Sequence, residues 1–302
     1  MNRIAKVFAI GLLALVGARA QQVTVDEKRD QIEALKIEDI PTPKPKTGEV
    51  LIRVGATGVS FAAMLGVQGK HQNKPPLPYV PGNEIAGHVV EVGPGVTNVK
   101  VGQRVTTGVS QGGFAEYAVA IAANVITIPE IMPYAQATNF PTLYPTAYGA
   151  LKWKADMKPG EVLLVHGAGG GSGLTGIEVG KAMGAVVIAS AGGADKLEAA
   201  RDAGADHLID YRKEDLRARV LEITGGRGAD VIYDPVGGSA FDVSLRCIAP
   251  EGRLIPMGFA SGTIPQIPAN ILLVKNVTVI GFYYGYWNGW GGKNEPSPKE
   301  AA

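Results

Sequence analysis

The sequence predicts an α/β protein of two domains, in which a mostly β domain precedes a doubly wound parallel sheet. The chain has 302 residues, and 46% of them are hydrophobic. Domains of about 150 residues are typical, so this length allows two domains, each with a buried core. In the second half, short apolar runs alternate about five times with helical patterns, which is typical of parallel strands joined by helices.

The first half of the chain has the pattern of short strands separated by turn residues. Three segments carry the clearest strand pattern: Glu49 to Val54, Ala86 to Val92 and Val99 to Val105. Glycine and proline punctuate the intervening stretches, for example at Gly93-Pro94-Gly95. We therefore expect a mostly β domain over residues 21–145.

The second half predicts a parallel sheet that is buried on both faces, because its apolar runs are continuous and do not alternate with polar residues. The runs are Val162 to Val165, Val186 to Ala189, Leu208 to Ile209, Val231 to Tyr233, Leu254 to Ile255 and Val277 to Ile280. Between them, Leu216, Val220 and Ile223 share one helical face. Ser239 and Asp242 form a capping-box pattern at the start of a later helix. We expect this domain over residues 146–285.

The two ends differ from the body of the chain. Arg3 and Lys6 precede an uncharged run, and Ala18-Arg19-Ala20 resembles a cleavage site for an export signal. Residues 1–20 are therefore a signal peptide, an organellar leader or a misassigned start, and the run is too short to span a bilayer. Residues 286–302 are rich in glycine, proline and charge, so we expect a mobile tail.

Composition narrows the class of partner. With 29 basic and 28 acidic residues the net charge is +1, so we expect no nucleic-acid partner and no anionic membrane surface. A small, neutral substrate fits this balance. The single cysteine, Cys247, excludes an intramolecular disulfide and any zinc site built from several thiolates.

A glycine-rich loop at the first strand-to-helix junction predicts a bound dinucleotide. It extends from His166 to Gly173, and Ala168, Gly170 and Gly173 occupy the three glycine positions of the dinucleotide fingerprint. Gly170 would let the backbone approach a diphosphate, and Gly173 would let the helix lie against the strand. The diphosphate would then meet free amides at the positive end of the helix dipole.

The residues that follow the second strand favour NADPH over NADH. Proteins that prefer NAD usually carry an acid about 20 residues beyond the loop, where it binds the ribose hydroxyls. Here the chain reads Ser190-Ala191-Gly192-Gly193, and Lys196 follows. Small residues leave room for the 2′-phosphate of NADPH, and a lysine supplies a compensating charge. The alternative is that Lys196 is only a solvated helix charge.

Together with the loop, several spaced motifs resemble the zinc-independent quinone oxidoreductase branch of the medium-chain dehydrogenase/reductase superfamily. They are EDIPTPKPKTGEVLIRV, GKHQNKPPLPYVPG, GADHLIDYRKED, YDPVGG and GFASG, in the expected order. The resemblance implies a GroES-like β domain and a Rossmann domain that binds NADPH. It also implies a homodimer formed through the edge strand from Asn276 to Phe282.

The resemblance assigns candidate site residues. Lys196 and Tyr211 fall where relatives hold the 2′-phosphate, and the rest of the cofactor path is Thr146, Gly170, Ser172, Phe259 and Ser261. Ser60, His71 and Tyr144 are the candidate catalytic residues. Ser60 and Ala63 stand where relatives usually carry Asn and Asp, and His71 replaces a frequent Tyr. Relatives also continue beyond the point where this chain becomes polar, in a segment that completes their β domain.

Metal is not expected, because Asn83 and Glu84 stand where zinc-dependent relatives have a histidine ligand. The four histidines, His71, His88, His166 and His207, have no ligand spacing, and each is expected to be structural or exposed to solvent.

The predicted function is NADPH-dependent hydride transfer to a quinone. Two alternatives are open: reduction of the C=C bond of an enone or enoyl thioester, and NADPH binding without turnover. Reducing a conjugated alkene requires protonation of a carbon, for which His71 or a water would serve. A cytoplasmic location fits the cofactor, whereas the signal-like segment favours export or an organelle.

Overall fold

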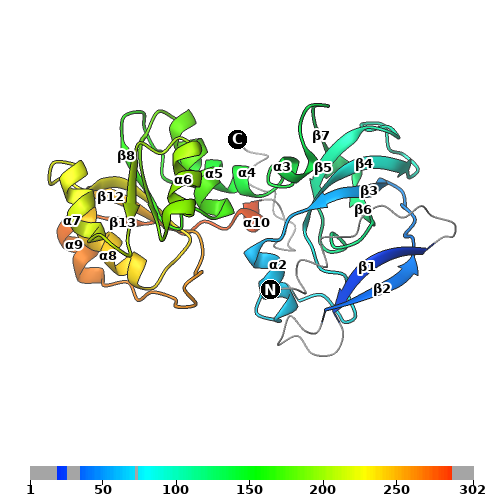
Figure 1. Ribbon diagram of the computed structural model, residues 1–302, viewed down its shortest axis with the longest axis horizontal. Coiled ribbons are helices and arrows are strands. Elements are labelled where there is room, and N and C mark those ends of the chain that lie inside the picture. The colour runs from blue at the N-terminus through cyan, green and yellow to red at the C-terminus, as the bar shows by residue number, and fades with distance from the viewer. Residues whose placement is uncertain (1–18, 26–34, 72–73, 288–302) are drawn as a thin grey trace. The chain divides into compact units, whose positions relative to one another are not determined.

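The computed structural model describes residues 19–25, 35–71 and 74–287 of the chain (Figure 1). They form two compact units that divide between Glu130 and Ile131, except that Thr106–Gly108 group with the second unit. Residues 131–145, which we expected in the first domain, pack with the second unit. Most of the expected leader, residues 1–18, and most of the expected tail, residues 288–302, lie outside the described residues.

The first unit contains a five-stranded sheet in the order β6-β3-β4-β5-β7. Its strands are β3 (Glu49–Thr57), β4 (Glu84–Val92), β5 (Arg104–Gly108), β6 (Tyr117–Ile121) and β7 (Ile126–Thr127). Strand β3 pairs antiparallel with both β4 and β6. The side chains of Val50, Ile52, Ile85 and Val89 are buried together between these strands and form the core of the GroES-like domain.

The strand expected from Val99 to Val105 begins only at Arg104. The preceding residues form a turn, in which the Gln103 amide donates to the Lys100 carbonyl and the Lys100 amide donates to the Gln103 side chain. Val99 is buried in the same core, so the apolar pattern located the core correctly and missed the turn.

Shorter elements complete the first unit. They are β1 (Arg19–Val25), β2 (Leu35–Pro41), α2 (Phe61–Val67) and the 3₁₀ turn η2 (Ala122–Asn124). Strands β1 and β2 pair antiparallel, with Ala20 opposite Ile40 and Gln21 opposite Asp39. The expected cleavage point between Ala20 and Gln21 therefore lies within the paired strand β1, and cleavage there stays a prediction.

The second unit is built on a six-stranded parallel sheet in the order β10-β9-β8-β11-β12-β13. The strands are β8 (Val162–Val165), β9 (Val186–Ala191), β10 (His207–Asp210), β11 (Ala229–Asp234), β12 (Ile248–Pro256) and β13 (Thr278–Val279). This order confirms the doubly wound Rossmann sheet. From β8 the chain adds β9 and β10 on one side and then continues with β11 on the other side, so the strand order reverses between β8 and β11. Ligands of such sheets bind beyond the carboxyl ends of the strands at that point.

Helices cover both faces of this sheet (Figure 1). One face packs against α4 (Leu143–Tyr148), the π-helix η3 (Gly149–Lys154), α5 (Gly171–Ala182) and α6 (Ala194–Asp202). The other face packs against α7 (Leu216–Ile223), α8 (Ser239–Cys247) and α9 (Ala269–Lys275). Neighbouring residues of β8 serve the two faces: Val165 packs in the first core and Leu164 in the second. A short helix, α3 (Tyr134–Ala137), precedes α4.

Helix α8 does not begin with the capping box that the sequence predicted. Ser239 is its first residue, and the cap is Gly238, which makes no side-chain hydrogen bond. Gly238 has a φ of 54°, a left-handed conformation that favours glycine. The capping pattern was wrong because the chain turns into the helix one residue earlier, at a glycine.

The end of the described chain differs from expectation. Tyr286 and Trp287, assigned to the mobile tail, lie in α10 (Tyr284–Trp287). The Trp287 ring stacks on Trp153 of η3 with their centroids 4.9 Å apart, and this stacking outweighs the polar composition of the segment. Strand β13 is shorter than the predicted run and lies at one edge of the sheet. A homodimer through residues 276–282 stays a prediction.

The side chain of Asp230, near the amino end of β11, is hydrogen-bonded to the amino end of β8. Its Oδ2 accepts a hydrogen bond from the Val162 amide at 2.8 Å and another from Arg227 Nη2 at 2.6 Å. Burial raises the pKa of this carboxyl, but the Arg227 and Val162 hydrogen bonds outweigh burial and hold the pKa below its ordinary value of 3.8. Charged Asp230 therefore stabilises the sheet at neutral pH.

Replacing Asp230→Asn is expected to lower the free energy of unfolding by about 2 kcal/mol at pH 7, since it removes a charge-assisted hydrogen bond to a largely buried group. The stabilisation is present above the unfolded-state pKa and is lost as the pH falls through the lower folded-state pKa. Denaturant unfolding from pH 7 to pH 3 measures it. The exposed pair between Asp156 and Lys158 supplies the control, Asp156→Asn. A gap between wild type and Asp230→Asn that is unchanged at pH 3 would contradict this account.

Candidate functional site

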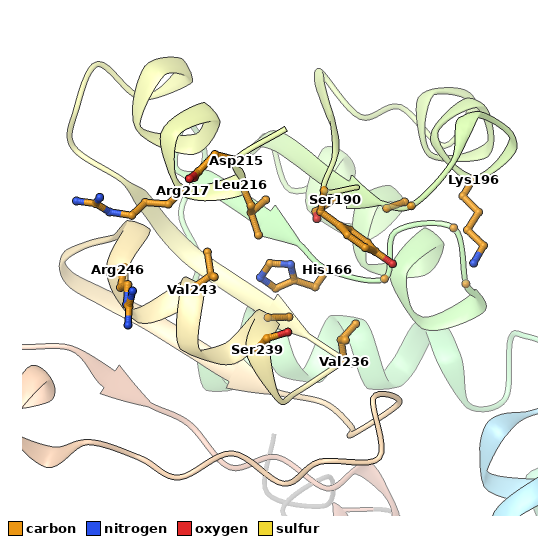
Figure 2. Close-up of a pocket in the computed structure, with 17 residues that line it drawn as sticks. His166, Ser190, Lys196, Asp215, Leu216, Arg217, Val236, Ser239, Val243 and Arg246 are labelled. Atoms are coloured by element: carbon orange, nitrogen blue, oxygen red, sulfur yellow. The ribbon is translucent and has the colours of Figure 1, made fainter. Parts of the chain in front are cut away.

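A cavity of about 710 Å³ opens at the carboxyl ends of the central strands (Figure 2). Five segments supply its walls: the loop after β8, the end of β9, the first turn of α6, the chain from β10 into α7, and α8 with the loop before it. In Figure 2, Lys196 lies at one end of the cavity, Arg217 and Arg246 lie at the other, and His166 lies between them. All of these residues belong to the second unit.

The glycine-rich loop packs so tightly on α5 that only glycine fits at Gly173. A Cβ atom there would lie 2.3 Å from the carbonyl oxygen of Gly167 and 2.7 Å from the Cα atom of Ala168. The capping residue of helix α5 is Gly170, which has no side chain to cap the helix. Its first amides are therefore left for a ligand, at the positive end of the helix dipole.

Ser172 links this end of α5 to the sheet. Its hydroxyl lies 3.0 Å from that of Tyr233, which is the largest fully buried side chain and belongs to β11. Burial raises the pKa of Tyr233 to about 12, although the hydrogen bond to Ser172 acts in the opposite direction. Both hydroxyls are thus neutral at pH 7, and the pair fixes the helix end beside the sheet.

The end of β9 offers space and no carboxylate. Ser190, Ala191 and Gly192 line the cavity there, and Tyr211 faces them from the end of β10. The Lys196 side chain crosses Gly169: a Cβ atom on that glycine would lie 2.5 Å from Lys196 Cβ. The structure therefore brings the predicted residues Gly170, Lys196 and Tyr211 to one cavity.

One carboxylate, that of Asp215, does line the cavity, and it caps helix α7. Its Oδ1 accepts a hydrogen bond from the Ala218 amide at 2.9 Å. This cap stabilises α7 and engages one of the two oxygens of Asp215.

His166, which we expected to be structural or exposed to solvent, lines the same cavity. Ser244 Oγ donates to the Ala240 carbonyl at 2.7 Å, so His166 Nε2 donates to Ser244 Oγ across 2.8 Å. Burial lowers the pKa of His166, against the effect of nearby Asp234, and the ring is neutral at pH 7. Because His166 directly follows β8, its place at the carboxyl edge of the sheet was the available signal.

Two predicted residues lie on the loop after β12. The Ser261 amide donates to the Val236 carbonyl at 2.9 Å, so this loop is held beside the loop after β11. Ser261 lines a second, smaller cavity of about 460 Å³ at the start of α8. Phe259 is partly exposed beside Gly237, where a Cβ atom would lie 3.0 Å from the ring.

Helix α4 carries Tyr144 and Thr146. The Tyr144 hydroxyl donates to Glu178 Oε2 of α5, and its ring stacks on Phe140 at 4.7 Å. Burial, together with the hydrogen bond to Glu178 and the charge of that carboxylate, raises the pKa of Tyr144 to about 12. Tyr144 is therefore a fixed, neutral phenol that joins two helices. Thr146 lies partly buried on the same helix.

The other two predicted catalytic residues lie in the first unit. Ser60 caps helix α2, where its Oγ accepts from the Ala63 amide at 3.1 Å. The His71 amide donates to the Leu65 carbonyl at 3.1 Å just beyond that helix. Their catalytic roles stay predictions, as do the cofactor contacts assigned above.

The donor groups of the chain do not fit a zinc site. Its one cysteine, Cys247, is buried in α8, and burial raises the pKa of the thiol to about 11. Within the part of the chain that is described, no three His, Cys, Asp or Glu side chains form a group able to hold a metal ion. Asn83, at the family's histidine position, donates its side-chain amide to the carbonyls of Val109 and Ser110. In that same part of the chain, no helix has the length and apolar character needed to cross a membrane.

Comparisons with known proteins agree with this architecture. Residues 46–130 match the family described as "Alcohol dehydrogenase GroES-like domain", and residues 171–293 match "Zinc-binding dehydrogenase". The chain is 43% identical over 253 residues to "Quinone oxidoreductase-like protein 2 homolog" of Nematostella vectensis, which covers 83% of this chain and 69% of that protein.

Two solved structures are similar throughout. The quinone oxidoreductase of Pseudomonas syringae has a TM-score of 0.80 and 32% identity, covering 89% of this chain and 83% of that one. The quinone oxidoreductase of Thermus thermophilus, solved also in complex with NADPH, has a TM-score of 0.75 and 30% identity, covering 90% and 82%. The chain is thus an oxidoreductase with a nicotinamide cofactor, and it belongs to the quinone oxidoreductase branch of the medium-chain dehydrogenase/reductase superfamily.

Proposed function

We propose that this protein uses NADPH to reduce a quinone and that it does so without a metal ion. The observation that carries the proposal is the cavity at the switch point of the sheet, in which the uncapped start of α5 adjoins a carboxylate-free end of β9. A diphosphate fits the first feature and a 2′-phosphate fits the second. Relatives named quinone oxidoreductase support the choice of acceptor.

The bound nicotinamide supplies the hydride, so the chain itself has to bind, orient and exclude water. Gly170 and Gly173 let the backbone approach the diphosphate, and Lys196 adds positive charge next to the loop. No strong acid is needed for a quinone, because its reduced oxygens are already stabilised. Tyr144 suits this chemistry, since its proton is held by Glu178 and its pKa is about 12.

The proposal that no metal ion takes part rests on which metal-binding side chains the chain carries and where they lie. Zinc in catalytic sites is held by three side chains drawn from His, Cys, Asp and Glu. In this chain the family's histidine position is Asn83, and the one thiol is buried in the core of the second unit. No step of the reaction is therefore assigned to a metal.

Lys196→Ala is expected to raise the KM for NADPH about tenfold and to leave the KM for NADH nearly unchanged. The lysine is an exposed cation beside the phosphate sites, and a charge-assisted contact of this kind is worth about 1.5 kcal/mol. Steady-state kinetics with both coenzymes measures the change. Arg201→Ala, which removes an exposed cation from the last turn of the same helix, is the control. Equal losses with NADPH and NADH would refute the assignment.

Parallel assays of NADPH oxidation with a quinone and with an enone distinguish the candidate reactions. The proposal predicts faster turnover with the quinone. Reduction of an enone needs an acid that protonates a carbon atom, and the Tyr144 hydroxyl already donates its proton in a hydrogen bond to Glu178. Preferred turnover of the enone would favour the alternative reaction. Saturable NADPH binding without oxidation by any acceptor would instead indicate a protein that binds the cofactor and does not turn over.

A further inference from the structure

Two arginines lie at the end of the cavity opposite Lys196 (Figure 2). Arg217 belongs to the first turn of α7, and Arg246 belongs to the last turn of α8. Burial raises the pKa of the Cys247 thiol, and nearby cations that include Arg217 act in the opposite direction. Arg217 therefore lies close to the residue that follows Arg246. The proposed function assigns no phosphate of the cofactor to this end of the cavity.

Neither guanidinium has an ion-pair or hydrogen-bond partner among the described residues. Other arginines of the same unit do have one: Arg219 pairs with Glu214 and Glu222, Arg227 with Asp230, and Arg253 with Glu161. The acids nearest in sequence are Asp215, whose Oδ1 caps α7, and Asp242, which lies one turn before Arg246 in α8. Neither of these carboxylates forms an ion pair with the two arginines. Both positive charges at this end of the cavity are thus left without a partner.

Helix stability does not explain the charge at Arg217. The backbone dipoles make the start of a helix positive, so a cation in the first turn is unfavourable. Arg217 is the second residue of α7, directly after the first turn begins at its cap, Asp215. Arg246 lies in the last turn of α8, where the dipole favours a cation. Because two unpaired positive charges at one end of a cavity also repel each other, a bound anion would offset the cost of placing Arg217 there.

We propose that Arg217 and Arg246 bind a small polyanion, a molecule with phosphate or carboxylate groups, beside the cofactor and separately from it. Guanidinium groups match the paired oxygens of both kinds of group. Leu216 and Val243, which precede the two arginines on α7 and α8, also line the cavity and offer apolar contact to the rest of such a molecule (Figure 2). The inference goes beyond the proposed function, and only its separateness from the cofactor rests on that function.

Isothermal titration of inorganic tripolyphosphate into the full chain saturated with NADP⁺ tests the site, because NADP⁺ would fill the opposite end of the cavity. Arg217→Gln and Arg246→Gln are each expected to weaken tripolyphosphate binding about 10-fold, as loss of a charge-assisted contact does. Higher salt should weaken this binding, since both partners are charged. Citrate is the second probe: tighter binding of tripolyphosphate than of citrate indicates a phosphorylated ligand, and the reverse order indicates a polycarboxylate.

Arg219→Gln is the matched control, because it removes the same charge from α7 but from a guanidinium that pairs with Glu214 and Glu222. It should change the affinity for tripolyphosphate by less than about 3-fold. Arg217→Gln should not lower the free energy of unfolding of the unliganded chain, whereas loss of a structural contact would lower it. Unchanged affinity in both arginine variants, no binding of either probe, or displacement of tripolyphosphate by NADP⁺ would overturn the inference. A folded chain that binds tripolyphosphate through Arg217 and does not bind NADP⁺ would refute the proposed function alone.

Discussion

The close approach between the first turn of α5 and the loop after β8 is the constraint on which the site depends. A side chain at Gly173 would collide with the Gly167 carbonyl, so glycine alone lets the helix begin directly at the strand end. Because β8 and β11 are neighbours in the sheet, the loop after β8 lies against the loop after β11: a Cβ atom on Gly167 would lie 3.1 Å from the Val236 side chain and 3.3 Å from that of Pro235. The result is an open edge where backbone amides meet a cavity, which suits an anionic cofactor and requires few catalytic side chains.

Basic residues lie at both ends of the cavity. The Lys196 stem lies on Gly169 of the glycine loop, and its contact with the 2′-phosphate stays a prediction. Arg217 and Arg246 line the opposite end of the cavity. The lining also includes neutral His166 and Asp215, one oxygen of which caps a helix.

The sequence was informative wherever a pattern repeats. Continuous apolar runs predicted the parallel strands, and the glycine spacing located the loop that begins α5. The predictions from the sequence were wrong where one hydrogen bond or one ring contact determines where a helix or strand begins or ends. Because residues 100–103 form a turn, β5 begins only after them. Gly238 and not Ser239 is the cap of α8. Trp287 lies in a helix, where its ring stacks on Trp153.

A crystal structure of the chain grown with NADPH would show where the nucleotide binds. We expect electron density for the diphosphate over the amino end of α5, and for the adenosine beside Gly192 at the end of β9. Nucleotide bound elsewhere on the folded chain, or no nucleotide at saturating NADPH, would contradict it.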